Sequence, residues 1–389
     1  MIKIKWKGKT LDFESVEWSG TDNQCSRQLT FTVPVNQYDK MFKSYGIALG
    51  DLVKLYSDKK LLFIGTITAR EKTAAVGTAS YTAVDFMQHL LRSIGTYVFR
   101  NTTPEAIAKR LCTELKIKIG SLAKTKIYIK RLIYEEQDIY DIIVGAYRKA
   151  KPQTKKKYMP VMEGSKFSVI EKGLSSGVKL TQGVNITDAS YNDTTDNIVN
   201  KVDIYSDSRV KLGQIENRKS QEKYGIYQSQ ITKEKGTDAK KEALALLTGV
   251  TKEASIEALG DVRAISGRSI VINDKATGLK GTFYISSDTH SFSNGTHTMS
   301  LDLSWVNEME SGAEETKDDT NKKQITNDAV CYYLENSKVY HSTTECSSCT
   351  NKAKKSTVAE LKKILITRGT NKGARKYRPC AKCWEESSE

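Results

Sequence analysis

Long apolar runs are missing from this chain of 389 residues. Hydrophobic residues make up 38% of the sequence and charged residues 28%, and no stretch approaches the roughly eighteen apolar residues of a membrane-spanning helix. We therefore expect no membrane segment. The opening MIKIKWKGKT also lacks the apolar core of a signal peptide, so we expect the chain to be made and assembled in the reducing cytoplasm.

Signatures of the common enzyme classes are also missing. The sequence has no Walker loop, no GxGxxG after a strand, no GxSxG elbow, no kinase signature and no HExxH. Two histidines, His290 and His297, flank the turn dipeptide Asn294-Gly295, which predicts a type I′ hairpin. That register places His290 opposite Met299 and His297 opposite Phe292, so the two rings are only diagonal neighbours. We predict ordinary strand residues here, no catalytic residue and no enzyme activity.

Cysteine and histidine are scarce and unevenly placed. The chain has 7 Cys and 4 His, and five of the cysteines and one histidine lie in its last sixty residues. In a reducing compartment such a cluster predicts a metal site before it predicts disulfides. The stretch PCAKC supplies Cys380 and Cys383 at a spacing that presents two thiolates to one ion, and YHSTTEC supplies His341 and Cys346. We predict a structural Zn²⁺ site that stabilises a terminal segment with few core residues.

The choice of the four ligands follows a resemblance to a small module at the ends of bacterial and phage proteins. That module has Tyr-His, a short gap, Cys, a helix and Pro-Cys-x-x-Cys, and this chain matches it at Tyr340, His341, Cys346, Pro379, Cys380 and Cys383. The resemblance favours His341, Cys346, Cys380 and Cys383 as ligands. Cys349 stands where the module has an apolar residue, and Cys331 lies nearby, so the fourth ligand stays open. A disulfide pair and free thiols are the alternatives to metal.

The pattern along the chain predicts a mainly β protein with an α+β insertion. In residues 1–92 apolar and polar side chains alternate as in β-strands, with one strand pair around SDKK. A β-type sequence returns in 196–306. Between them, residues 93–195 read as an α/β domain. It has one helix with Thr103 as N-cap and Pro104 as its first residue, and a second helix that ends before Pro152. Residues 307–326 are polar and predict a linker to the zinc-binding-like module at 327–389.

The two β regions resemble each other. Glycines at 50, 65 and 77 in the first fall at 267, 281 and 295 in the second, each within a similar succession of strands and turns. We interpret this as a duplication that gives two similar small β-barrels. Chance similarity of two β-meanders is the alternative.

The net charge of +15 is compatible with binding to nucleic acid. The lysines, however, are spread along the whole chain, with KPQTKKKY (151–158) as the densest run, and no nucleic-acid-binding motif accompanies them. We therefore predict a solvated basic surface and do not expect nucleic acid as a partner.

Residues 1–306 resemble the baseplate hub proteins of contractile phage tails and of phage-tail-like bacteriocins, specifically the type found in defective prophages of Gram-positive bacteria. The resemblance is carried, in order, by stretches such as VEWSGTDNQCSRQLTFTV, LGDLVKLYSDKKLLFIGTITAREKT, TPEAIAKRLCTELKIKIG and GTFYISSDTHSFSNGTHTMSLDLSWV. The terminal module is not a universal part of that family.

The resemblance implies a structural protein that assembles as a homotrimer and joins the six-fold tail tube to the three-fold spike. Its implied partners are the central spike protein, the tail tube or a tube-initiator protein, the tape-measure protein and the baseplate wedge proteins. It also implies assembly in the bacterial cytoplasm and release as part of a phage tail or tail-like particle. A hub-associated cell-wall hydrolase and a zinc-containing nucleic-acid-binding protein are the alternative functions.

Overall fold

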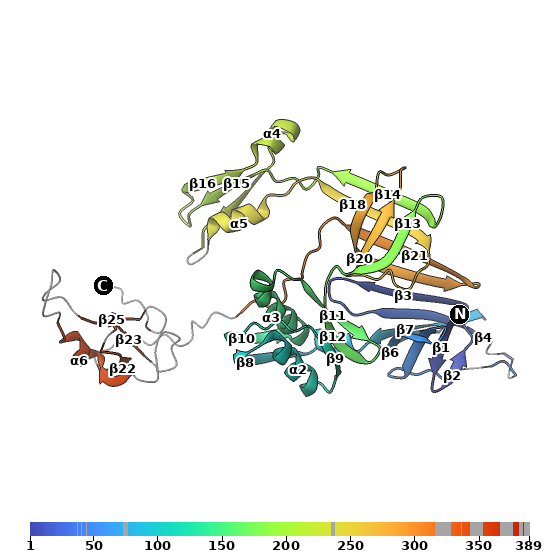
Figure 1. Ribbon diagram of the computed structural model, residues 1–389, viewed down its shortest axis with the longest axis horizontal. Helices are drawn as coiled ribbons and strands as arrows, with labels where there is room; N and C mark the ends of the chain where they lie inside the picture. Colours follow the sequence, from blue (N-terminus) through green and yellow to red (C-terminus); the bar gives the residue numbers. More distant parts are fainter. Residues whose placement is uncertain are drawn as a thin grey trace. The chain divides into compact units, whose positions relative to one another are not determined.

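The computed structural model describes residues 1–36, 38–39, 41–43, 45–72, 77–234, 238–315, 328–335, 337–342, 353–365, 376–380 and 384. The chain divides into two compact units, residues 1–315 and 316–389. It is mainly β, as predicted (Figure 1). Among the described helices, none combines the length and the apolar character needed to cross a membrane.

The first β region forms one antiparallel stretch of sheet in the order β3-β4-β7-β6-β5-β1-β2. Its strands are β1 (Ile2–Trp6), β2 (Lys9–Leu11), β3 (Ser15–Thr21), β4 (Gln28–Val35), β5 (Leu52–Ser57), β6 (Lys60–Lys72) and β7 (Gly77–Asp85). Strand β4 alternates as the sequence predicts, with Leu29, Phe31 and Val33 buried in the core of this region. The predicted strand pair around SDKK is β5 and β6, which pair antiparallel, with Ser57 opposite Lys60 next to the turn.

The second β region continues the same sheet in the order β14-β18-β21-β20, with β19 on β20 and β13 on β19. Its strands are β13 (Ser175–Thr181), β14 (Ile186–Thr194), β18 (Thr251–Leu259), β19 (Ser269–Asn273), β20 (Lys280–Ser293) and β21 (Thr296–Ser304). Strands β13 and β14 lie before residue 196, the predicted start of this region. The β20–β21 hairpin turns at Asn294-Gly295, as predicted. Strand β20 also pairs with β3, which joins the two regions.

The two regions repeat one strand order. Strands β3-β4-β7-β6-β5 of the first correspond to β14-β18-β21-β20-β19 of the second, and every neighbouring pair in both sets is antiparallel. The register of β6 on β7 shifts after Ile67, and that of β20 on β21 shifts after Ile285. Two independent β-meanders have no reason to share both the order and the position of this bulge.

A glycine occupies the same place in each repeat. The Gly50 N–H donates to the Ile67 carbonyl and the Gly267 N–H donates to the Ile285 carbonyl, both at 2.8 Å. Both glycines have φ near +80°, a conformation that favours glycine over other residues. The predicted correspondence of positions 50 and 267 is therefore supported.

The second predicted glycine match is wrong. Gly65 and Gly281 are offset by two residues, because the bulges align Gly65 with Phe283. The closure of each region into a separate barrel stays a prediction.

An α/β part lies between the two regions in sequence. It contains α1 (Met87–Leu91), β8 (Ile94–Thr102), α2 (Pro104–Glu114), β9 (Lys118–Leu122), β10 (Ile129–Asp138), α3 (Ile139–Thr154), β11 (Tyr158–Glu163) and β12 (Lys166–Glu171). Helix α2 begins as predicted, with the Thr103 side chain accepting from the Ala106 N–H. The predicted end of α3 before Pro152 is wrong, since the helix continues to Thr154. A proline in the last turn removes only one helical hydrogen bond, which the helix tolerates.

Two smaller sheets complete the fold. Strands β15 (Lys201–Tyr205), β16 (Lys211–Glu216) and β17 (Gln228–Thr232) form one sheet, accompanied by α4 (Arg218–Tyr224) and α5 (Ala239–Leu246). In the second unit, β22 (Val330–Tyr333), β23 (Val339–His341), β24 (Lys354–Thr357) and β25 (Arg378–Pro379) form the other, with helix α6 (Val358–Lys362). Helix α6 starts at a capping box formed by Thr357 and Glu360.

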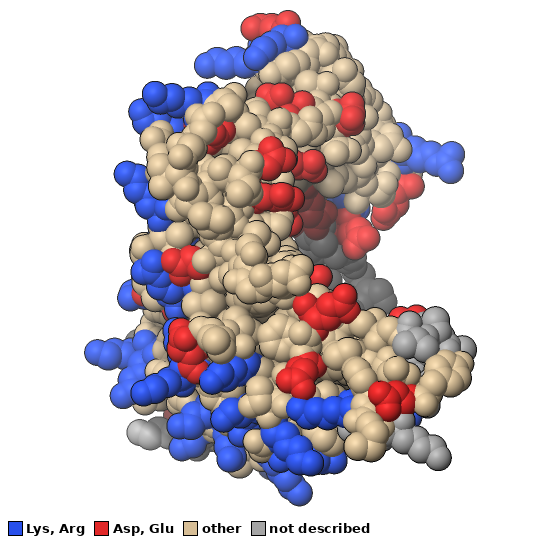
Figure 2. Space-filling model, turned by 90° about the vertical axis from the view of Figure 1, so that its right-hand side faces the viewer, with Lys and Arg blue, Asp and Glu red and all other residues tan. Residues whose placement is uncertain are grey.

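The basic surface follows from the alternation of the outer strands. Figure 2 shows Lys and Arg gathered on the lower part of one face, where the first β region lies. In β1, exposed Lys3 and Lys5 alternate with buried Ile4 and Trp6. This is the pattern of a strand with one side in the core and the other in water.

Candidate functional site

The predicted metal ligands that the structure describes lie at the ends of two neighbouring strands. Strand β23 pairs in parallel with β25, with Tyr340 opposite Pro379. His341 ends β23 and Cys380 directly follows β25, and both are buried, with 2% and 7% of their surface exposed. The Cys380 N–H donates to the Tyr340 carbonyl at 2.9 Å. Cys346 and Cys383 lie outside the described residues, as does the rival ligand Cys349.

Tyr340 holds this end of the sheet together. Its carbonyl also accepts from Trp384 Nε1 at 3.2 Å, and the two aromatic rings meet edge to face with centroids 5.6 Å apart. The described core of the unit is small and consists of Cys331, Tyr340, Val358, Leu361, Tyr377, Cys380 and Trp384. A buried imidazole next to a buried thiol is a donor pair that suits zinc.

Cys331, the other rival ligand, has the surroundings of a core residue. It lies in β22 opposite Ser356, and its Sγ donates to the Ser356 carbonyl at 3.4 Å. Burial raises the pKa of the Cys331 thiol to about 11, so the thiol keeps its proton at neutral pH.

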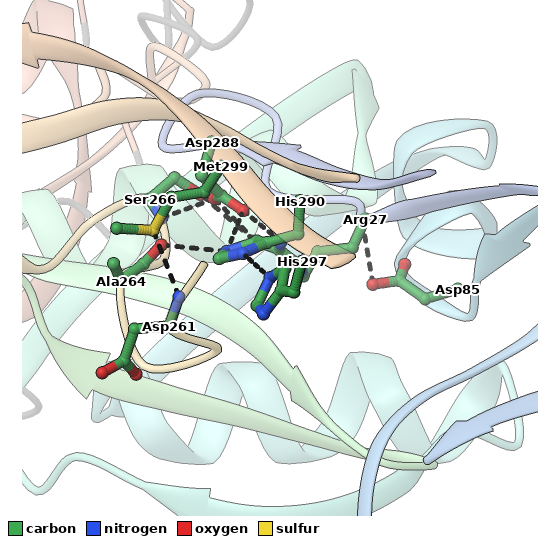
Figure 3. A network of polar contacts seen from close by, with 9 residues as sticks. All are labelled: Arg27, Asp85, Asp261, Ala264, Ser266, Asp288, His290, His297 and Met299. Atoms are coloured by element: carbon green, nitrogen blue, oxygen red, sulfur yellow. Dashed lines mark hydrogen bonds and ion pairs between the residues drawn. The ribbon is translucent and has the colours of Figure 1, made fainter. Parts of the chain in front are cut away.

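A buried polar network lies where the two β regions meet (Figure 3). Arg27, just before β4, binds Asp288 of β20 through both terminal nitrogens, with Nη1 2.9 Å from Oδ1. Asp288 is fully buried and also accepts from the Ser266 N–H at 2.6 Å. Burial by itself would raise the pKa of Asp288, but the Arg27 guanidinium outweighs it and holds that pKa below its usual value. The guanidinium also stacks over the Trp18 ring, 4.0 Å from its centroid.

The two strand histidines belong to the same network. The predicted register is confirmed, with His290 opposite Met299 and His297 opposite Phe292. The rings are nevertheless in direct contact. His290 Nε2 donates to the Ala264 carbonyl at 3.1 Å, so Nδ1 accepts from His297 Nε2 at 3.0 Å. Burial lowers both pKa values, that of His297 to about 4, so both rings are neutral at pH 7 and serve packing and hydrogen bonding.

Asp85 ends β7 beside the same network. Its carboxylate accepts from Ser26 Oγ at 2.8 Å and from the backbone N–H groups of Arg27 and Met87, both at 3.0 Å. Burial outweighs these hydrogen bonds and raises the pKa of Asp85 to about 6. The folded protein therefore holds a proton on Asp85 at pH 5, where the unfolded chain has released it.

This difference predicts a pH dependence of stability. The free energy of unfolding should fall as the pH rises from about 4 to about 6, because the folded state binds more protons than the unfolded state over that window. Asp85→Asn should remove this contribution, on the order of 3 kcal/mol for a shift of two pKa units. Urea denaturation of both proteins from pH 4 to 7 measures it, with Asp207→Asn as an exposed control. Parallel pH profiles for wild type and Asp85→Asn would contradict the assignment.

Sequence reasoning missed this network, although a signal was present. In SDTHSF the residues that face the core are Asp288, His290 and Phe292, and two of these three are polar. A strand that turns polar side chains inward predicts a buried partner for them. Arg27 could not be identified as that partner, because it is 261 residues away in sequence.

Comparisons with known proteins connect the chain to prophages. The family described as YQBQ-like matches residues 16–304. The protein YqbQ of Bacillus subtilis (strain 168) is 30% identical over 310 residues, which cover 77% of this chain and 94% of YqbQ. The phage-like element PBSX protein XkdQ of the same strain is 29% identical over 313 residues, with the same two coverages of 77% and 94%.

A solved structure agrees with the fold. The 43 kDa tail protein of prophage MuSo2 from Shewanella oneidensis has a TM-score of 0.60 and 14% identity, covering 78% of this chain and 97% of that one. At this identity the likeness concerns the fold alone. The match to the YQBQ-like family ends at residue 304, before the unit that carries the predicted metal ligands.

Proposed function

Because the chain belongs to the YqbQ-like family of prophage tail proteins, we propose that it is the hub of a contractile-tail baseplate. Its task there is structural: three copies join the six-fold tail tube to the three-fold spike. Membership of the family supports a place in the tail.

The repeated strand order is the observation that carries the hub proposal. Each chain holds two five-stranded units of the same topology in one sheet. Three copies therefore offer six nearly equivalent units to a six-fold partner and three complete chains to a three-fold one. Contacts between copies in such an obligate assembly should bury more than about 2,000 Å².

Assembly of the purified full chain tests the proposal. We expect a trimer by native mass spectrometry and sedimentation, and a ring by electron microscopy that binds the spike protein at one end and the tube or tube-initiator protein at the other. Tape-measure and wedge proteins should join only this assembled form. A chain that stays monomeric at the highest attainable concentration, alone and with spike and tube proteins, would refute the hub. A clear band in peptidoglycan zymography would instead favour a cell-wall hydrolase.

We also propose that the second unit binds one structural Zn²⁺ through His341, Cys346, Cys380 and Cys383. The neighbouring, buried positions of His341 and Cys380 support it, as does the small described core of the unit. In this proposal the ion fixes the ends of β23 and β25, and the four ligands leave no open position for a substrate.

A further inference from the structure

The internal repeat leaves two strand edges without a partner in the described part of the chain. Within the chain, residues 287–293 of β20 pair with β3. The counterpart of β20 is β6, whose described residues beyond Ile67 pair with β7 on one side only. The counterpart of β3 is β14, whose residues 188–194 pair with β18 and, in the described part of the chain, with no strand on the other side. Residues 68–71 of β6 and most of β14 are exposed.

We propose that the free edge of β6 in one copy of this chain pairs antiparallel with the free edge of β14 in the next copy. The contact repeats between copies the β20–β3 pairing that the chain already makes within itself. The inference deepens the hub proposal and depends on it only for the number of copies that close the ring. Backbone N–H and C=O groups along both edges gain partners in this contact.

The register of the contact follows from the repeat. The two bulges align Thr68 with Ser286, and therefore Arg70 with Asp288. On the other edge, Trp18 of β3 lies opposite Leu29 of β4, and Tyr191 of β14 lies opposite Ala254 of β18. Leu29 and Ala254 occupy the same position in the two repeats, so Trp18 is aligned with Tyr191, and Gly20 with Asp193. Within the chain, Asp288 faces Gly20. Between copies, the same register places Arg70 directly opposite Asp193.

The charges of these two residues are complementary. Both side chains are exposed: Arg70 Nη1 donates to the Ile47 carbonyl at 3.4 Å, and Asp193 Oδ2 accepts from the Tyr191 hydroxyl, also at 3.4 Å. Opposite charges directly across a strand pair stabilise it, and like charges destabilise it.

The faces of the two strands also agree. Arg70 lies opposite Tyr81, a residue of the first core, and Asp193 is on the same face of β14 as Ala189, which packs on the second core. Both side chains therefore point to the core side of the joined sheet, as Asp288 does within the chain.

The contact inside the chain carries a similar pair with the charges exchanged. There the acid, Asp288, is on the long strand, and the base, Arg27, reaches it over Gly20. A side chain at position 20 would collide with Arg27, whose Nη1 lies 2.6 Å from where its Cβ would be. At the contact between copies, Asp193 occupies that position and meets Arg70 itself. Because β6 carries the basic Arg70 at this position, a strand with an acidic residue opposite it, such as β14, is favoured as its partner over a strand with a basic residue there.

Strand β14 begins the repeated sheet order and β6 belongs to the other repeat, next to its last strand β5, so the contact joins two different edges and is head to tail. Such a heterologous contact gives a ring when the rotation closes and a filament when it does not. With two equivalent units per chain, closure after three copies makes all six junctions alike.

An engineered disulfide tests the register in the full-length protein. Ala69 and Thr194 are the counterparts of the facing residues Ser287 and Thr21. Ala69→Cys with Thr194→Cys in one chain, oxidised with glutathione disulfide, should give a ladder of covalent dimers and trimers on a non-reducing gel. Ala69→Cys with Asn192→Cys, shifted by two residues, is the matched control. The wild type shows how much cross-linking the native cysteines give by themselves.

Charge reversal tests the Arg70–Asp193 pair. Arg70→Glu or Asp193→Arg alone should raise the concentration of half-assembly at least about tenfold, and the two together should restore it. Lys109→Glu and Asp207→Arg make the same charge changes at exposed positions away from both edges and should leave assembly unchanged.

The outcomes separate the pairing from the hub. If the wild type is a trimer but Ala69→Cys with Thr194→Cys forms no more cross-link than the shifted control, the edge pairing is wrong and the hub proposal stands. A specific cross-link in a ring of a different number of copies upholds the pairing and overturns the three-fold hub.

Discussion

Replacing Cys380 with Ser, or removing metal with a chelator, should unfold the second unit and leave residues 1–315 folded. In comparable zinc peptides the bound ion contributes roughly 10–16 kcal/mol of apparent folding free energy. The described core of this unit comprises seven residues, and a small domain with a limited core depends on such a contribution. Metal analysis should give one zinc per wild-type chain and none for Cys380→Ser, and limited proteolysis should remove the second unit of the variant rapidly.

Cys331→Ala is the matched control for the zinc prediction. This thiol is buried in the same core, with its Sγ on the Ser356 carbonyl. Its loss should lower the stability of the unit by the cost of a small cavity but retain the zinc. Loss of zinc from Cys331→Ala, or full zinc content in Cys380→Ser, would show that the ligand set is wrong. Cys349→Ala tests the remaining rival in the same way.

Local signals in the sequence were sufficient for much of the fold. The N-cap Thr103, the turn at Asn294-Gly295 and the capping box of Thr357 and Glu360 each place a helix or hairpin within a few residues. Each depends on contacts between neighbours in sequence, so the sequence itself contains the evidence. The extension of α3 past Pro152 shows the limit, because a local rule gave the wrong end.

The joining of the two β regions could not be predicted from such signals. The β20–β3 pairing brings together residues more than 250 positions apart, and nothing in the alternation of either strand specifies its partner. The glycine comparison found the right repeat through Gly50 and Gly267 but matched Gly65 wrongly, because two residues connect β5 to β6 whereas six connect β19 to β20. A comparison of glycine spacings does not account for such a difference in turn length.

The prediction of a metal site rests on a different kind of signal. The short spacing of PCAKC and YHSTTEC restricts where their ligands can lie, and the structure brings His341 and Cys380 to adjacent strand ends. The Arg27–Asp288 pair has no such short-range spacing. Its only trace is a charged residue at an inward position of a strand, which predicts a partner but not which residue it is.

That buried pair gives the largest expected effect within residues 1–315. Arg27→Ala leaves the Asp288 carboxylate fully buried without its main partner, which should lower the free energy of unfolding by about 3–5 kcal/mol. In the wild type the lowered pKa of Asp288 contributes stability above its unfolded pKa, and this is lost as the pH falls. In the variant, burial alone raises the pKa of Asp288, so the deficit relative to wild type should shrink toward acid pH.

Urea denaturation followed by tryptophan fluorescence measures this loss, since Trp18 lies directly under the guanidinium. Arg110→Ala is the matched control, because its i,i+4 ion pair with Glu114 is exposed and its loss should cost less than about 1 kcal/mol. Arg27→Met combined with Asp288→Leu should recover most of the stability, since apolar side chains remove the unpaired charge. If Arg27→Ala were no more costly than Arg110→Ala at neutral pH, the pair would not stabilise the junction of β20 with the first β region.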